Sequence, residues 1–155
     1  MHLQSGDIAG DFILKDQNNN DISLDIFGDK IIILYFYPKD MTKGCTIEAN
    51  EFSSNFASFR DRNCVILGVS GDSLDSHKKF IKKENLSISL LSDPSFEVCK
   101  KYGVYAKKSM YGREYMGIIR STFIIKDKVI LKAFYNVKSS GHAMKILKEI
   151  ENIAI

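Results

Sequence analysis

Residues 31–37 read IIILYFY, an unbroken apolar run that is too short for a helix and rich in residues that favour strands. A strand without polar positions is buried on both faces, which is typical of a parallel sheet covered by helices on both sides. Residues 64–70, CVILGVS, predict a second strand of the same kind. The two stretches indicate an α/β protein whose central strands are parallel.

Helical patterns alternate with these strands and give the order of the elements. Apolar side chains at steps of four and three predict one long helix after the first strand; they are Cys45, Ala49, Phe52, Phe56 and Phe59. The remaining predicted elements are helices at 74–84, 95–103 and 143–153, a short strand at 89–91, and hairpins pairing 12–14 with 22–24 and 121–125 with 129–135. This order predicts a single domain over residues 1–155 with a three-layer α/β/α sandwich. A thioredoxin-like sheet preceded by an N-terminal β-hairpin is the best match.

The composition excludes several classes of function. The 155 residues carry 22 basic and 19 acidic side chains without a block of like charge, which does not argue for a nucleic-acid partner. The N-terminal segment MHLQSGDIAGDF lacks the basic and apolar parts of a secretion signal, and no apolar run is long enough to span a membrane. We therefore expect a cytoplasmic protein, in which the three cysteines are reduced thiols.

Residues 37–48, YPKDMTKGCTIE, join the first strand to the longest helix and place Cys45 in the first turn of that helix. Active sites of open α/β sheets gather at this carboxyl edge. The unpaired N–H groups and positive end of a helix stabilise a thiolate, the nucleophilic form of cysteine. Thr42 could direct its hydroxyl into the same pocket. The alternative is that Cys45 is a small buried apolar residue, but the strand–loop–helix setting and the T-x-x-C spacing favour a nucleophile.

At these residues the chain resembles a known family. Pro38, Thr42 and Cys45 match the P-x-x-x-[TS]-x-x-C signature of peroxiredoxins, and G-C-T-x-E at 44–48 resembles the bacterioferritin-comigratory-protein subgroup. Further segments resemble the family in the expected order: GDIAGDF at 6–12, SDP at 92–94, KYGV at 101–104, and YG, GI and RSTF between 111 and 123.

The resemblance implies a peroxiredoxin-type thioredoxin fold and a thiol-dependent peroxidase that needs no cofactor. Cys45 would attack hydrogen peroxide or an organic hydroperoxide and become a sulfenic acid. Arg120 would supply the cation that stabilises the thiolate and the departing oxygen. Thr42 would hydrogen-bond the peroxide, and Pro38 would shield the pocket from water. Glu48 would either pair with Arg120 or cap the helix, and both interpretations stay open.

The cysteine positions depart from the commonest family pattern. Asn50 stands where many members have a resolving cysteine, and the next helix, residues 73–84, has none. Cys64 begins a parallel strand and should lie at the opposite edge of the sheet. Cys99 is expected on the inner face of a helix, either as a small core residue or as a resolving cysteine. We therefore expect a one-cysteine cycle with glutathione, glutaredoxin or thioredoxin as reductant, in a monomer or weak homodimer.

Two other functions fit the same scaffold. A thioredoxin-like disulfide oxidoreductase would need C-x-x-C, but Thr42 occupies the first cysteine position. A non-enzymatic chaperone or binding protein would not need the catalytic signature. The three histidines have no metal-ligand spacing with the cysteines, and His77 is expected to be a partly buried helix residue. No phosphate-binding glycine loop indicates a nucleotide or flavin.

Overall fold

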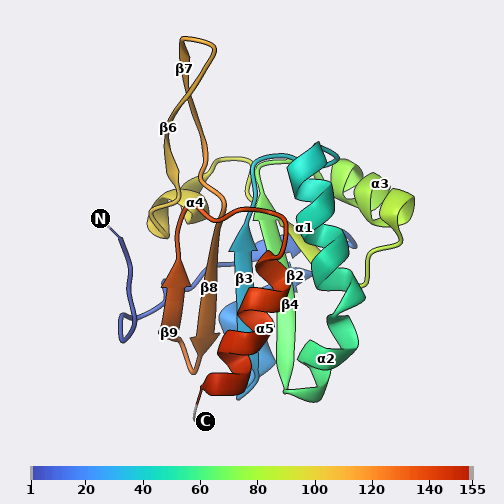
Figure 1. The fold of residues 1–155 in the computed structure, drawn as a ribbon, viewed down its shortest axis with the longest axis vertical. Helices are drawn as coiled ribbons and strands as arrows, with labels where there is room; N and C mark the ends of the chain where they lie inside the picture. Colours follow the sequence, from blue (N-terminus) through green and yellow to red (C-terminus); the bar gives the residue numbers. More distant parts are fainter. Residues whose placement is uncertain (1, 154–155) are drawn as a thin grey trace.

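The computed structural model describes residues 2–153, which form a seven-stranded mixed sheet with the order β2-β1-β5-β4-β3-β8-β9 (Figure 1). Its strands are β1 (Leu14–Asp16), β2 (Asp21–Ile22), β3 (Ile31–Phe36), β4 (Cys64–Ser70), β5 (Ser89–Ser92), β8 (Ser121–Lys126) and β9 (Val129–Phe134). The three central strands β3, β4 and β5 are parallel, which confirms the prediction for β3 and β4, and β8 pairs with β3 in the antiparallel sense. The predicted N-terminal hairpin is confirmed, with its strands displaced by about two residues.

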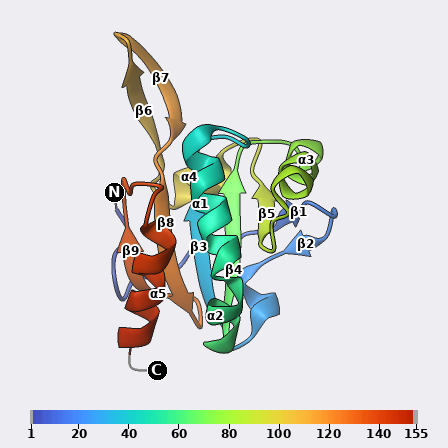
Figure 2. The same ribbon diagram turned by 45° about the vertical axis from the view of Figure 1, so that its right-hand side comes forward.

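Helices cover both faces of this sheet, which confirms the three-layer prediction. They are α1 (Lys43–Ser54), α2 (Phe56–Asp61), α3 (Leu74–Glu84), α4 (Glu97–Lys101), α5 (His142–Asn152) and the 3-10 helix η1 (Leu24–Phe27). Figures 1 and 2 show α1 and α5 in front of the sheet and α4 behind it. Successive residues of β3 face opposite sides, so the odd-numbered ones pack with α1, α3 and α5 and the even-numbered ones with α4. Two separate cores therefore lie on the two faces of one sheet.

The single long helix predicted after β3 is wrong, because the helix is interrupted at Asn55. The side-chain amide of Asn55 donates to the carbonyl oxygen of Glu51 at 2.8 Å, and its backbone N–H approaches the same oxygen at 3.2 Å. Asparagine competes in this way with regular helix bonding. Phe52 and Phe59 are both fully buried on either side of the break, so the apolar spacing continues and conceals it.

A second difference is the strand pair β6 (Tyr105–Met110) and β7 (Arg113–Ile118), which the sequence did not predict. These strands form a separate ribbon, here called the β6–β7 ribbon, that projects beyond the main sheet (Figures 1 and 2). Tyr111 and Gly112 both have positive φ, as a tight two-residue hairpin turn requires. Most ribbon side chains are partly or fully exposed, so no alternation of apolar and polar residues marked the strands.

Candidate active site

Cys45 lies where the sequence predicted it, in the first turn of α1 and beyond the carboxyl end of β3. Thr42 is the N-cap of this helix, and residues 37–42 connect it to the strand. Cys45 is a free cysteine with only 1% of its surface exposed, and it belongs to the core on the α1 side of the sheet. The sulfur therefore lies at the start of a helix, where unpaired N–H groups favour an anion.

Arg120 holds Cys45 and Glu48 with one guanidinium group. Its Nη1 donates to Glu48 Oε1 at 2.7 Å, and its Nη2 lies 3.5 Å from Cys45 Sγ. Glu48 is three residues after Cys45, so both project from the same face of α1. A Cβ atom at Gly44 would lie 3.1 Å from Nη2, so glycine leaves room for the guanidinium. Of the two open interpretations of Glu48, the structure shows the pairing with Arg120.

The ionisation of this cluster is set by burial and by its opposite charges. Burial alone would lower the pKa of Arg120, but Glu48 and Cys45 outweigh it and raise that pKa. Burial raises the pKa of Glu48 to about 7, even though Arg120 acts in the opposite direction. Arg120 is thus a permanent cation, whereas Glu48 can change its protonation near neutral pH.

Thr42 and Pro38 lie on the loop before α1. The Thr42 hydroxyl donates to the carbonyl oxygen of Lys39 at 2.8 Å, and the side chain is exposed. Pro38 is partly buried directly after Tyr37. The hydrogen bond to Lys39 uses the only hydrogen of the hydroxyl and leaves its oxygen free to accept.

The same loop is fixed by a buried network that sequence reasoning missed. Asp40 accepts from the Tyr37 hydroxyl at 2.6 Å and from the Ser76 hydroxyl at 2.8 Å, and lies 2.7 Å from His77 Nδ1. His77 Nε2 donates to the carbonyl oxygen of Leu91 at 2.9 Å, because a carbonyl can only accept. The expectation that His77 is partly buried is wrong, since it has no exposed surface. Only the fold brings α3 to this loop, so no local sequence pattern indicated the contact between Asp40 and His77.

Neither of the other two cysteines lies beside Cys45. Cys64 is paired with Ile31 at the amino end of β3, as predicted, and burial raises its pKa to about 11. Cys99 is fully buried in the core on the α4 side, across the sheet from Cys45. Burial and then Asp93 raise the pKa of Cys99, which disfavours a reactive thiolate. Asn50 donates to Glu84 at 3.0 Å and thereby joins α1 to α3.

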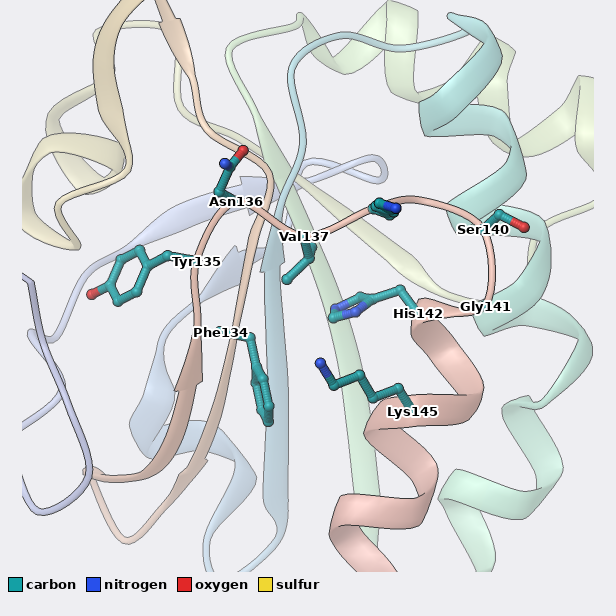
Figure 3. A pocket seen from close by; sticks show the side chains of 9 residues that line it. Phe134, Tyr135, Asn136, Val137, Ser140, Gly141, His142 and Lys145 are labelled. Atoms are coloured by element: carbon teal, nitrogen blue, oxygen red, sulfur yellow. The ribbon is translucent and has the colours of Figure 1, made fainter.

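A cavity of about 550 Å³ opens beside the site, between the end of β9 and the start of α5 (Figure 3). The imidazole of His142 points into it, and His142 Nε2 lies 2.7 Å from the Thr122 hydroxyl. Burial, and after it the charges of Lys145 and Arg120, lower the pKa of His142 to about 4. This histidine is therefore neutral at physiological pH, and it charges only in acid.

We expect His142→Gln to flatten the pH dependence of stability on the acid side. Between pH 6.5 and about 4 the unfolded chain binds a proton at this histidine that the folded chain does not, so stability falls as pH falls. The variant should lose about 3 kcal/mol less than the parent across this range. Chemical denaturation at a series of pH values measures the difference. His2→Gln, at an exposed position, is the control, and identical slopes in parent and His142→Gln would contradict the expectation.

Comparison with known proteins agrees with the fold and shows the family. The model of the AhpC/TSA family matches residues 5–134. A bcp peroxiredoxin of Helicobacter pylori strain J99 is 48% identical over 149 residues, which cover 96% of this chain and 98% of that protein. Peroxiredoxin Bcp of Bacillus subtilis is 39% identical over 155 residues and 99% of both chains.

Solved structures give the same result. A cysteine-to-serine mutant of PrxQ from Xylella fastidiosa has a TM-score of 0.92 and 34% identity over 97% of both chains. Peroxidoxin BcpB from Mycobacterium tuberculosis has a TM-score of 0.88 and 31% identity over 99% of this chain and all of that chain.

The fold and the site thus define a peroxiredoxin, a thiol peroxidase built on the thioredoxin-like fold. The chain belongs to the AhpC/TSA family, and the two relatives described above, which match over almost their whole length, are Bcp peroxiredoxins. The family implies a peroxide as substrate and a thiol as reductant. Within residues 2–153, no helix combines the length and the apolar character that crossing a membrane requires.

Proposed function

We propose that this peroxidase works with one cysteine, whose sulfenic acid is reduced by an external thiol. What supports the proposal is the position of the other two cysteines, because Cys64 lies at the far end of the strands and Cys99 on the other face of the sheet. A disulfide needs Cα atoms within about 7 Å. Asn50, at the position of the usual resolving cysteine, cannot form one.

The proposed oxidation step uses the cluster around Arg120. The Cys45 thiolate attacks one peroxide oxygen, the O–O bond breaks, and Cys45 becomes a sulfenic acid while the departing oxygen takes a proton. Arg120 stabilises the thiolate and the negative charge on the departing oxygen. Thr42 donates to the bound peroxide once its hydroxyl turns away from Lys39. Pro38 shields the pocket from bulk water.

The proposed reduction step completes the cycle. A thiol attacks the sulfenic acid and forms a mixed disulfide with release of water, and a second thiol then regenerates Cys45. Glutathione, glutaredoxin or thioredoxin serves as the donor in the cytoplasm, without a nucleic-acid or membrane partner. Residues 1–155 act as one domain, in a monomer or weak homodimer. The Xanthomonas campestris bacterioferritin comigratory protein, a structural neighbour at 33% identity, reduces alkyl peroxides, which supports organic hydroperoxides as substrates here.

The double variant Cys64→Ser, Cys99→Ser should keep most of its turnover with an external thiol, within about a factor of two of the parent, because neither sulfur takes part in recycling. Turnover is followed by peroxide consumption, and intact mass spectrometry identifies the oxidised product. A stoichiometric dose of peroxide should give a sulfenic acid that becomes a mixed disulfide on addition of glutathione. A Cys45–Cys99 disulfide in peptide maps of the oxidised parent would contradict the one-cysteine cycle.

A further inference from the structure

Glu48 is a buried carboxyl group, and within the described residues only one of its two oxygens forms a hydrogen bond. Its side chain has no exposed surface, and Oε1 accepts from Arg120. Within residues 2–153, Oε2 has no hydrogen-bond partner. An ionised carboxylate in this position leaves charge and lone pairs unsatisfied, which is costly in a protein interior, whereas a protonated carboxyl carries no charge.

The other buried side-chain oxygen left unpartnered in this part of the chain is the hydroxyl of Tyr35. Tyr35 lies in the same core as Cys45, and burial and then the charges of Glu48 and Cys45 raise its pKa. Glu48 on α1 and Tyr35 on β3 thus each carry an unpartnered oxygen on the face of the sheet that holds Cys45. Buried polar groups without a partner are rare in native proteins, and a catalytic role is one of the reasons for which they are kept.

The charge balance around Arg120 is the second observation. One guanidinium contacts two acids, Glu48 at 2.7 Å and Cys45 at 3.5 Å. If both acids were ionised, the buried cluster would carry one excess negative charge, and burial makes such an excess costly. One proton shared between the two acids brings the cluster to neutrality.

The other groups that face this cluster do not change its balance of charges. Tyr35 on β3 is protonated, and His142 on α5 is neutral because burial lowers its pKa to about 4. Glu51 on α1 adds to the effects that raise the pKa of Glu48. Lys108 on β6 is a further cation near the site, and it is only partly buried and donates to the carbonyl oxygen of Ile118 at 3.0 Å.

We propose that Glu48 holds the proton of the active site while Cys45 is a thiolate, and gives it up when the peroxide is reduced. This inference rests on the proposed function, in which Cys45 attacks as a thiolate. The thiolate, the hydroperoxide ROOH and the protonated Glu48 become the sulfenic acid, the alcohol ROH and the Glu48 carboxylate. The O–O bond breaks, an S–O bond forms, and the carboxyl proton goes to the departing oxygen.

The cluster remains neutral at each stage of this cycle. After oxidation the sulfenic acid is uncharged, and Glu48 and Arg120 form a complete ion pair. When the external thiol regenerates Cys45, its new thiol proton passes to Glu48 and the thiolate forms again. A pKa of Glu48 near 7 suits a group that gains and loses a proton in each turnover.

Counting protons during a single turnover tests this proposal. The parent is mixed with one equivalent of hydrogen peroxide in weak buffer with a pH indicator, at a pH where the ultraviolet absorbance of the thiolate has reached its plateau. We expect the parent to take no proton from solvent for each sulfenic acid formed, because Glu48 supplies it. Glu48→Gln keeps the shape but cannot supply the proton, so it should take up one.

Glu51→Gln is the matched control, because it removes an acidic group one turn away that hydrogen-bonds Gly141 N, and it should behave like the parent. Uptake of one proton by the parent would overturn the role of Glu48. Absence of any sulfenic acid in the parent would instead overturn the proposed function.

Infrared difference spectra of the parent test the same proposal without a Glu48 variant. The carbonyl band of a protonated carboxyl should disappear when peroxide is added, and Cys45→Ser should show no such loss. A parent that forms sulfenic acid without losing this band would contradict the proposal.

Discussion

Replacing Cys45 with serine is expected to abolish reduction of hydrogen peroxide and to lower the rate by about 1,000-fold or more. Serine has almost no anionic fraction near neutral pH, so the cluster of Arg120 and Glu48 has no nucleophile to stabilise. The carboxyl group of Glu48 and the guanidinium remain in place, because serine differs from cysteine only in having oxygen in place of sulfur. Peroxide consumption with an external thiol measures the effect.

The control for this prediction is the same substitution at the other cysteines. Cys64→Ser and Cys99→Ser change buried sulfurs of the two cores and leave the site untouched. Thermal unfolding of all three variants shows whether each one is folded. Turnover by Cys45→Ser within about tenfold of the parent would remove Cys45 from the proposed role.

Arg120→Lys is expected to lower the rate of Cys45 oxidation by about 100-fold or more, although the charge is kept. The guanidinium reaches Glu48 with one nitrogen and Cys45 with the other, at 2.7 and 3.5 Å. A single ammonium group cannot hold both positions, so the thiolate or the ion pair with Glu48 loses its partner. Rapid quenching followed by mass spectrometry measures sulfenic acid formation, which suits a chain without tryptophan.

Arg113→Lys provides the matched control, because Arg113 is exposed on β7 and the chemical change is identical. It should react with peroxide at the rate of the parent. If Arg120→Lys also reacted at that rate, Arg120 would have no part in stabilising the departing oxygen.

The central strands of the fold were predictable because their residues are buried on both faces. The runs at 31–37 and 64–70 have no polar position before their ends, so their strands and the parallel pairing followed from hydrophobicity alone. The β6–β7 ribbon rests on its own strand pairing and a tight turn at Tyr111–Gly112, and such a structure has no apolar alternation to detect. Asn55 interrupts its helix through a side-chain hydrogen bond, which an apolar periodicity does not register.

The residues of the site likewise fall into those that the sequence marks and those that only the fold brings together. Cys45 could be singled out from its place between a strand and a helix, whereas Arg120 is distant in sequence and was found through its resemblance to a family segment. The sequence left two interpretations of Glu48 open, and only its buried contact with Arg120 shows that it pairs with this arginine. Asp40 and His77 come together through the packing of α3 against β5 and the loop, which no local pattern encodes.

The burial of Cys45 places a demand on the reduction half of the catalytic cycle. With 1% of the residue exposed, the sulfur is closed to a thiol carried on a protein. Asp40 ties the preceding loop to α3, so a wider entrance costs these hydrogen bonds or requires the first turn of α1 to move. We therefore expect reduction by a protein thiol to be a gated step, whose speed is limited by how often the protein opens.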